Sequence, residues 1–454
     1  MRSAKNLSTV GCFHFLFLAC LALIVLAPVP VRCADFPYTA TIAEGRTAVK
    51  EVMEQTGASS VSVAFTDGDR LVWTETFGYA DRASGTLPAK ETMYCIGSTS
   101  KMVATIAVMR LVDQKKVSLD APVADYIRSF TMLSPGYRKI TVRMLLNHSA
   151  GFPGTDERNA ETTSPLTFDY SAQIRETLAA GRLKHDPGCM NIYCNDCFTM
   201  VEQLVEAVTG KKYAQFVHDE IFAPLGMTHS RYPLGYFPEG SFAVRYDRDG
   251  ALPQLFLNTG ASGGLYSTPT DVAKLAMMLA GGGITANTRI LSEAAVTEMG
   301  KDQTLSTFNP VRQDGMSFGL GWDTVRQPGL RAVGVTGWQK GGDVPFYGSV
   351  MSVAPKERLA VVVLGASGRF GSGSATIVAE RILLKALAET GRIASMPGPV
   401  ATKPAPAKKS SGDEADSSGG YYANNSTLLK VKAGPGGSLD IVTYDAAKGS
   451  WKDW

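Results

Sequence analysis

The chain has no marked excess of charge of either sign. Its 454 residues include 45 Lys and Arg against 42 Asp and Glu, which leaves a formal net charge of +3. A balance this close gives no case for a nucleic-acid-binding protein or for a protein held on an anionic membrane surface, because both rely on concentrated positive charge. No internal repeat is apparent either, so the sequence gives no sign of a repeat architecture.

Cysteine is also scarce: there are 7 cysteines, and 3 of them fall within the first 33 positions. The others are Cys95, Cys189, Cys194 and Cys197. The last three follow a Cys-x4-Cys-x2-Cys spacing that lacks a convincing fourth zinc ligand, since His185 is near in sequence but has no supporting partner. The sequence fits either a disulfide within this cluster or free thiols.

The N-terminus has the three-part layout of a secretory signal peptide. Arg2 and Lys5 precede an apolar run over residues 13–27, and the first and last of residues 31–33 are small. We predict that residues 1–33 are removed on export to a periplasm or to the outside of the cell. The alternative is an uncleaved membrane anchor, against which stand the shortness of the run and the prolines that follow it.

Strand-like stretches stand at both ends of residues 34–395, with a mostly helical stretch of about 115–260 between them. We expect strands over 60–65, 71–79, 330–335, 346–354 and 359–364. This order predicts an α/β (α+β) fold in which an antiparallel sheet, holding both ends of the domain, is flanked by helices and joined to an all-helical lobe. A cleft between the two parts is a natural place for a site.

The C-terminal part differs in composition. Residues 396–418 are rich in Pro, Ala, Lys, Ser and Gly, which indicates a linker. Residues 419–454 contain short β-like runs that are too few for an independent core. We therefore expect this segment either to dock on the main domain or to be an incomplete domain.

Ser98 and Lys101 open the stretch around which the domain is organised. From Lys101 to Asp113 the chain is mostly apolar and lacks Gly and Pro, which predicts a helix buried on most sides. A lysine at the start of such a helix needs a partner or a task. Residues three apart share a face, so the amine can take the hydroxyl proton once burial lowers the amine's pKa. Alone, Ser-x-x-Lys also fits a helix cap beside a solvated lysine.

Further motifs follow in a fixed order. Tyr193-Cys194-Asn195 lies in the predicted helical lobe, and Lys340-Gly341-Gly342 precedes a predicted strand. Four more stretches complete the series: 77–81, 145–153, 224–227 and 263–271. Together with the Ser-x-x-Lys element, the series resembles the serine β-lactamase and penicillin-binding-protein superfamily, nearest to the class C β-lactamases with their DD-peptidase and esterase relatives. The resemblance runs over about residues 42–391 and implies a β-lactamase/transpeptidase-like fold.

The resemblance also implies roles. Ser98 would be the nucleophile that forms an acyl-enzyme, and Lys101 would be its proton acceptor. Tyr193 would carry a proton to the leaving group. Asn195 would hydrogen-bond both the substrate and Lys101. Lys101 and Tyr193 would also assist the attack of water on the acyl-enzyme.

The third motif would provide the rest of the site. Lys340 would favour proton loss from its neighbours and offer a cation to a substrate carboxylate, and the backbone N–H groups of Ser98 and Asp343 would form an oxyanion hole. Gly341 and Gly342 would let a substrate approach the strand closely. Two features depart from the family pattern: Gly341 stands where relatives often have Thr, and the carboxylate of Asp343 is poorly matched to anionic substrates.

Two nearby features receive a structural interpretation. His148 follows an apolar stretch and has no sequence-local acid or nucleophile to serve, so we interpret it as a satisfied structural histidine. A Cys95 to Cys194 disulfide across the cleft is a further idea that the sequence leaves open.

Two other functions compete with this interpretation. Residues 260–264 fit the Gly-x-Ser-x-Gly nucleophile elbow with Ser262 as nucleophile, although an elbow needs a helix directly after the serine. The second competing function is that of a penicillin-binding or sensing protein that does not turn its ligand over. We predict an exported serine hydrolase acting on an amide, β-lactam, D-Ala peptide or ester, without metal, cofactor or nucleic acid. Its partner would be a small molecule or peptide, carboxylate-bearing for β-lactams and D-Ala peptides, with cell-wall peptide as one candidate.

Overall fold

The computed structural model describes residues 38–165, 168–248, 250–286, 288–304 and 316–397, and four strands between 420 and 453. The predicted signal peptide lies outside these residues, as does nearly all of the predicted linker. Among the described residues, no helix combines the length and apolar character that crossing a bilayer requires.

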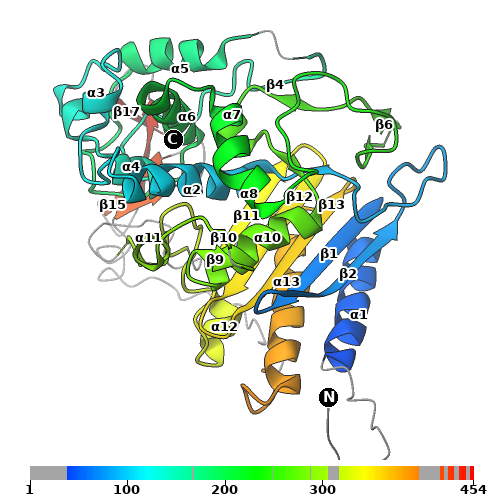
Figure 1. Cartoon of the computed structure of the whole chain (residues 1–454). Helices are drawn as coiled ribbons and strands as arrows, with labels where there is room; N and C mark the ends of the chain where they lie inside the picture. Colours follow the sequence, from blue (N-terminus) through cyan, green and yellow to red (C-terminus); the bar gives the residue numbers. More distant parts are fainter. Residues whose placement is uncertain are drawn as a thin grey trace, which may run out of the picture. The chain divides into compact units, whose positions relative to one another are not determined.

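An antiparallel five-stranded sheet forms the centre of the domain (Figure 1). Its order is β11-β12-β13-β1-β2, so strands from the two ends of the domain lie side by side. The strands are β1 (Ser60–Asp67), β2 (Arg70–Gly78), β11 (Trp338–Val344), β12 (Tyr347–Ala354) and β13 (Leu359–Ala366). Ser60 is paired with Ala366 where β1 meets β13. The predicted fold is confirmed.

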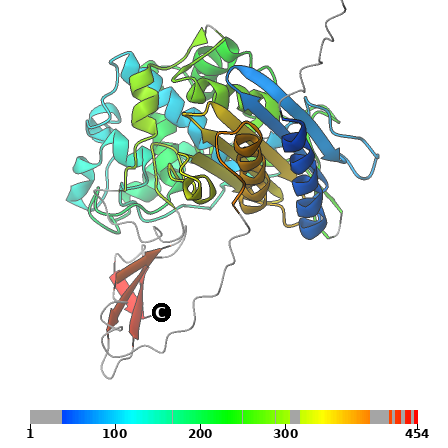
Figure 2. The same ribbon diagram turned by 90° about the horizontal axis from the view of Figure 1, so that it is seen from below.

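Helices cover both faces of this sheet. α1 (Thr39–Thr56) and α13 (Ser372–Glu389) pack together on one face, as Figure 2 shows, and α10 (Pro269–Ala280) contacts β1, β12 and β13. Side chains of β13 alternate between two cores: Val361 and Val363 join the core under α1 and α13, and Val362 joins the core on the opposite side. Burial on both faces explains why β13 is apolar throughout.

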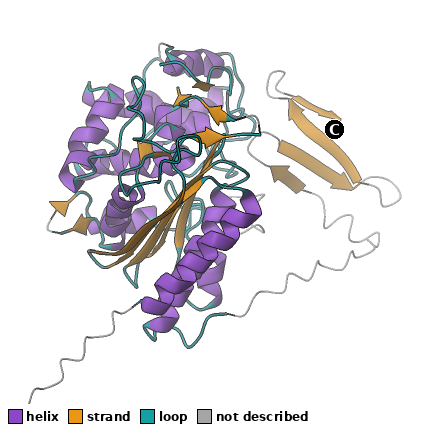
Figure 3. Cartoon of the chain, turned by 90° about the vertical axis from the view of Figure 1, so that its right-hand side faces the viewer, coloured by secondary structure: helices purple, strands orange, loops and turns teal. Residues whose placement is uncertain are grey.

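The chain between β2 and β11 builds the helical lobe and its connections (Figure 3). Besides α10, its helices are η1 (Gly97–Thr99), α2 (Ser100–Asp113), α3 (Val123–Tyr126), η2 (Pro135–Lys139), α4 (Val142–Leu146), α5 (Tyr170–Ala179), α6 (Asn195–Thr209), α7 (Tyr213–Val217), the π-helix η3 (His218–Phe222), α8 (Ala223–Leu225), α9 (Gly260–Gly263), α11 (Glu293–Met299) and α12 (Pro328–Ala332). Four short strand pairs accompany them: β3 (Tyr94–Cys95) with β8 (Tyr266–Ser267), β4 (Glu161–Thr162) with β7 (Phe256–Leu257), β5 (Arg245–Tyr246) with β6 (Ala251–Leu252), and β9 (Ile284–Thr285) with β10 (Thr288–Arg289).

One predicted strand is wrong. Residues 330–335 were expected to be extended, but α12 occupies their first part and β11 begins only at Trp338. Pro328 stands at the start of α12, where its missing N–H is no loss, and the Gln327 side chain caps the helix by accepting the Leu330 N–H at 2.7 Å. These local capping preferences outweigh the β-like composition of the segment.

The C-terminal segment is more regular than predicted. β14 (Gly420–Ala423), β15 (Leu428–Ala433), β16 (Leu439–Asp445) and β17 (Ser450–Asp453) form a sheet of four antiparallel strands in chain order. The β-like runs that the sequence predicts at residues 428–431 and 439–444 correspond to β15 and β16.

The start of α2 is held against the edge strand β11 by a close backbone approach. A Cβ atom added to Gly342 would lie 2.1 Å from the Ile96 carbonyl oxygen and 2.7 Å from the Thr99 nitrogen. The Ser349 hydroxyl bridges the same place, donating to the Ile96 carbonyl oxygen at 2.6 Å. A glycine is required at 342 because only its bare Cα lets the strand lie this close to η1.

We therefore predict that Gly342→Ala destabilises the protein by about 1–3 kcal/mol, the usual cost of forcing extra volume into a packed interior. Urea unfolding followed by circular dichroism measures the change. Gly373→Ala in α13 is the matched control: its added Cβ has no neighbour within 4 Å, so no loss of stability is expected. Equal unfolding midpoints for Gly342→Ala and wild type would contradict the close-approach argument.

Candidate active site

Ser98 and Lys101 meet as their spacing predicts. The Lys101 Nζ lies 2.9 Å from the Ser98 Oγ, 2.7 Å from the Asn195 Oδ1 and 2.6 Å from the main-chain oxygen of Ser262. Lys101 is fully buried, whereas Ser98 keeps part of its surface. The arrangement places a buried amine beneath a hydroxyl that a ligand can still reach.

Helix termini position these groups. Ser98 lies in η1, and Ser100, the first residue of α2, donates its hydroxyl to the Gly97 carbonyl oxygen at 2.6 Å. Asn195 is the first residue of α6, and its backbone N–H donates to the Thr155 Oγ1 at 3.2 Å. Two helix N-termini from distant parts of the chain therefore bring Asn195 to Lys101.

Tyr193 lies between the two lysines. The Lys101 Nζ stands 4.9 Å from the centre of the Tyr193 ring, and the Lys340 Nζ lies 5.2 Å from that centre and 3.3 Å from the phenol oxygen. The phenol also contacts the Ser98 hydroxyl. The residues predicted from the first and second motifs are thus in one place.

His148 supports Tyr193 from behind, which agrees with its structural interpretation. The two rings stack with centroids 4.4 Å apart, and the His148 Nδ1 accepts the Cys194 N–H at 3.1 Å. Burial, and then the positive charges of Lys101 and Lys340, lower the pKa of His148 well below its usual value. A neutral ring with an acceptor at Nδ1 fixes the Tyr193–Asn195 segment.

Lys340 is held by a carboxylate that the sequence did not single out. The Lys340 Nζ lies 2.9 and 3.0 Å from the two carboxylate oxygens of Asp323, and it donates to the Gly341 carbonyl oxygen at 2.6 Å. Asp323 precedes the Thr324–Gln339 bridge, which aligns its segment with the edge of β11. No local pattern marks such a residue, because it becomes Lys340's partner only through this pairing.

The pKa values of the two lysines shift in opposite directions. Burial, and then the positive charge of Lys340, lower the pKa of Lys101 well below its usual value. For Lys340, burial alone would lower the pKa, but the charges and hydrogen bonds of Asp323 and Tyr193 together outweigh it and leave the pKa raised. Burial raises the pKa of Tyr193 to about 12 although Lys340 opposes the shift. These shifts favour a neutral amine at Lys101, an ammonium at Lys340 and a protonated phenol at Tyr193.

The edge of β11 faces Ser98 with its backbone. The Gln339 N–H donates to the Thr324 carbonyl oxygen at 2.8 Å, and the Gly341 N–H donates to Asp323 Oδ2 at 2.9 Å. Strand alternation points the Asp343 N–H the same way, and a Cβ on Gly97 would lie 2.9 Å from the Asp343 nitrogen. Ser98 lies in the first turn of its helix, where N–H groups lack an intrahelical acceptor. Both backbone donors that the resemblance implies are therefore adjacent.

Ser262 has a different position from a nucleophile at an elbow. It lies in the four-residue helix α9, its hydroxyl is buried, and that hydroxyl donates to the Thr259 carbonyl oxygen at 3.5 Å. Its contribution to the site is the main-chain oxygen that accepts from Lys101. Gly264 and β8 follow directly, so the strand-turn-helix geometry of an elbow is absent at this position.

The cysteines of the described chain are free thiols. Cys95, Cys194 and Cys197 are buried, and Cys189 is exposed. Neither the Cys95–Cys194 pairing nor a disulfide within the 189–197 cluster is present in this structure.

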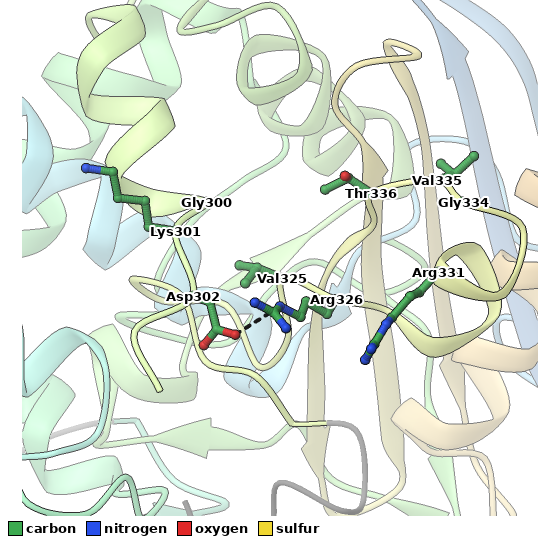
Figure 4. Close-up of a pocket in the computed structure, with 9 residues that line it drawn as sticks. All are labelled: Gly300, Lys301, Asp302, Val325, Arg326, Arg331, Gly334, Val335 and Thr336. Atoms are coloured by element: carbon green, nitrogen blue, oxygen red, sulfur yellow. Dashed lines mark ion pairs between the residues drawn. The ribbon is translucent and has the colours of Figure 1, made fainter. Parts of the chain in front are cut away.

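A separate hollow of about 590 Å³ lies on another part of the domain (Figure 4). Its lining includes Asp302, Arg326 and Arg331, and Asp302 is paired with Arg326 at 3.0 Å. None of the residues predicted for the site lines this hollow.

Comparison with known proteins supports the same family. The Beta-lactamase family model matches residues 46–386. The chain is 29% identical to the Homo sapiens protein described as "Putative beta-lactamase-like 1" over 418 residues, covering 87% of this chain and 77% of the human protein. It is 25% identical to a "Putative D-alanyl-D-alanine carboxypeptidase" of Salmonella agona, covering 68% of this chain and 79% of that protein.

A solved structure shares the fold. The octameric penicillin-binding protein homologue from Pyrococcus abyssi superposes with a TM-score of 0.62 at 21% identity, covering 89% of this chain and 88% of that one. With the family model matching most of the domain, this chain belongs to the beta-lactamase family of serine hydrolases, which includes β-lactamases, DD-peptidases and esterases.

Proposed function

We propose that the protein is a serine hydrolase that forms an acyl-enzyme at Ser98 on an ester, amide or lactam. The observation that carries the proposal is the 2.9 Å contact between the Ser98 Oγ and the buried Lys101 Nζ. A serine hydroxyl needs a base to become a nucleophile, and a desolvated amine beside a second cation is such a base at neutral pH.

Acylation follows from the positions of these groups. The Ser98 Oγ attacks the substrate carbonyl carbon while its proton passes to the Lys101 Nζ. The N–H groups of Ser98 and Asp343 stabilise the oxyanion. The Tyr193 phenol gives its proton to the leaving group and regains one from the Lys101 ammonium. Water then attacks the acyl-enzyme with the same groups used in reverse, which releases the acid and restores Ser98.

Lys340 sets the protonation states in this scheme. Its charge lowers the pKa of Lys101 and opposes the rise in the pKa of Tyr193, so both groups exchange protons more readily. Asn195 fixes the Lys101 amine by accepting one of its hydrogen bonds. Asp343 takes part through its backbone N–H only, because its carboxylate accepts the Ser372 N–H at 2.6 Å.

We also propose that the protein is exported, on the basis of the signal-peptide pattern in residues 1–33. Sequencing the N-terminus of the mature protein tests this point. A mature chain that begins near Ala34 supports export, and a chain that keeps its apolar run contradicts cleavage.

Replacing the nucleophile is the first test of function. Ser98→Ala should lower kcat/KM by about 10³-fold or more, the usual loss when a catalytic nucleophile is removed. The assay compares a chromogenic cephalosporin, a D-Ala-D-Ala peptide and a short-chain nitrophenyl ester. Ser262→Ala is the matched control, because it keeps the main-chain oxygen that binds Lys101.

Full activity of Ser98→Ala on every substrate that wild type turns over would end the proposal. Loss of activity in Ser262→Ala alone would favour the elbow hypothesis. Intact-mass analysis of wild type distinguishes a hydrolase from a binding protein. A lasting covalent adduct without product release would indicate a binding protein.

The charge of Lys340 gives a second prediction. Deprotonated Lys101 is the active form, so kcat/KM should rise with pH through the pKa of Lys101. Lys340→Gln removes a positive charge that lowers this pKa, so the acid limb should move to higher pH by about 1–2 units. pH profiles of the two proteins measure the shift.

Lys301→Gln is the control for this shift, because Lys301 is an exposed lysine paired with Glu298 outside the site. Its acid limb should match that of wild type. An acid limb that stays in place or moves to lower pH in Lys340→Gln would contradict the assignment of Lys101 as the base.

A further inference from the structure

The Lys340 ammonium has its hydrogen-bonding capacity filled by the protein. An ammonium has three donor hydrogens, and this one faces both carboxylate oxygens of Asp323, the Gly341 carbonyl oxygen and the Tyr193 phenol. The Lys340 side chain is 1% exposed, so it does not turn toward solvent. A ligand carboxylate would have to displace Asp323 to reach it.

Asp323 also occupies the next donor along the strand edge. Its Oδ2 accepts the Gly341 N–H at 2.9 Å, which removes the backbone group beside Lys340 from the reach of a ligand. Gly341 has no side-chain hydroxyl to replace it. The Asp323 carboxylate thus accepts hydrogen bonds from both the Lys340 ammonium and the Gly341 N–H, the two donors of β11 at this point.

Asp343 adds a second carboxylate near β11. Asp343 is exposed, two residues beyond Gly341, and its carboxylate is held by the Ser372 N–H and hydroxyl at the start of α13. Lys340 and Asp323 cancel each other as a pair. The Lys101 amine is buried and contacts three oxygens within the protein, so it is not a free cation for a ligand either.

We propose that this site selects acyl substrates that carry no carboxylate on the side facing β11, and that Asp323 enforces the choice by occupying Lys340 and the Gly341 N–H. The inference rests on the proposed function and narrows its substrate class to uncharged esters and amides. Lys340, which the sequence analysis expected to bind a substrate carboxylate, instead serves within the protein by adjusting the pKa values of Lys101 and Tyr193. A substrate carboxylate would meet Asp323 and Asp343 rather than a free ammonium.

Two boronic acids of matched shape test the inference. Boron forms a bond to the Ser98 Oγ and becomes tetrahedral, while the hydroxyl proton passes to Lys101, so binding reports the acylation site without turnover. The probes are 3-carbamoylphenylboronic acid, which is uncharged, and 3-carboxyphenylboronic acid, which is anionic. Wild type should bind the uncharged compound about tenfold more tightly, as expected for a ligand that avoids like-charge repulsion.

Asp323→Asn should abolish the preference for the uncharged compound. Without its counter-ion the buried Lys340 becomes a costly unpaired group, and the ligand carboxylate can take the place of Asp323. The ratio of inhibition constants should therefore shift by about tenfold or more toward the carboxylated compound. If Asp323→Asn does not fold, Asp323→Ser, which also lacks the charge, replaces it.

Asp69→Asn is the charge-matched control, because Asp69 lies in the β1–β2 turn and pairs with the exposed Arg358. Its ratio should equal that of wild type. Tighter binding of the carboxylated compound by wild type, or an unchanged ratio in the uncharged variants at 323, overturns the inference. Failure of wild type to bind either compound in a Ser98-dependent way contradicts the proposed function and, with it, the inference.

Discussion

Two buried amines face one phenol with a single carboxylate to balance them, and the rest of the site depends on this charge arrangement. Placing two ammonium groups near one another in a dry interior is costly, so one of them must lose its proton or gain a counter-ion. Asp323 contacts Lys340 and not Lys101. Lys340 therefore stays charged while the pKa of Lys101 falls. This ion pair keeps Lys340 charged and leaves Lys101 as the amine whose pKa is lowered.

The scaffold serves this arrangement through close backbone approaches. β11 lies against η1 because Gly342 and Gly97 leave no Cβ between them, and this contact sets the distance from the Asp343 N–H to Ser98. α9 approaches Lys101 with a main-chain oxygen, and the Glu202 carboxylate holds that helix by accepting the Ala261 N–H at 2.9 Å. The main-chain oxygen of Ser262, which cannot rotate away, therefore gives the amine one fixed partner beside the side chains of Ser98 and Asn195.

The same fold can act on different acyl substrates because the chemistry needs only the nucleophile, the base and the oxyanion donors. What distinguishes one member from another is the set of groups at the strand edge. In the described part of this chain that edge carries a lysine paired with Asp323, a glycine and an outward carboxylate. The similarity to the carboxypeptidase describes the shared family, whereas the strand edge is where we propose that the ligand is selected.

The sequence by itself determined the fold class and the buried helix after Lys101, because helical spacing and strand alternation are local properties of the chain. The residues of the second and third motifs followed from the resemblance to a known family. The sequence also marked Ser98 and Lys101 as a pair, since three residues in one helix leave little freedom. Only the tertiary structure decided the partner of Lys340, because Asp323 reaches it through the pairing of Thr324 with Gln339, on the two sides of the segment that contains α12. It likewise decided that Ser262 contributes a carbonyl oxygen and that residues 330–335 are not a strand. Such outcomes depend on which segments pack together, and neither composition nor periodicity records that information.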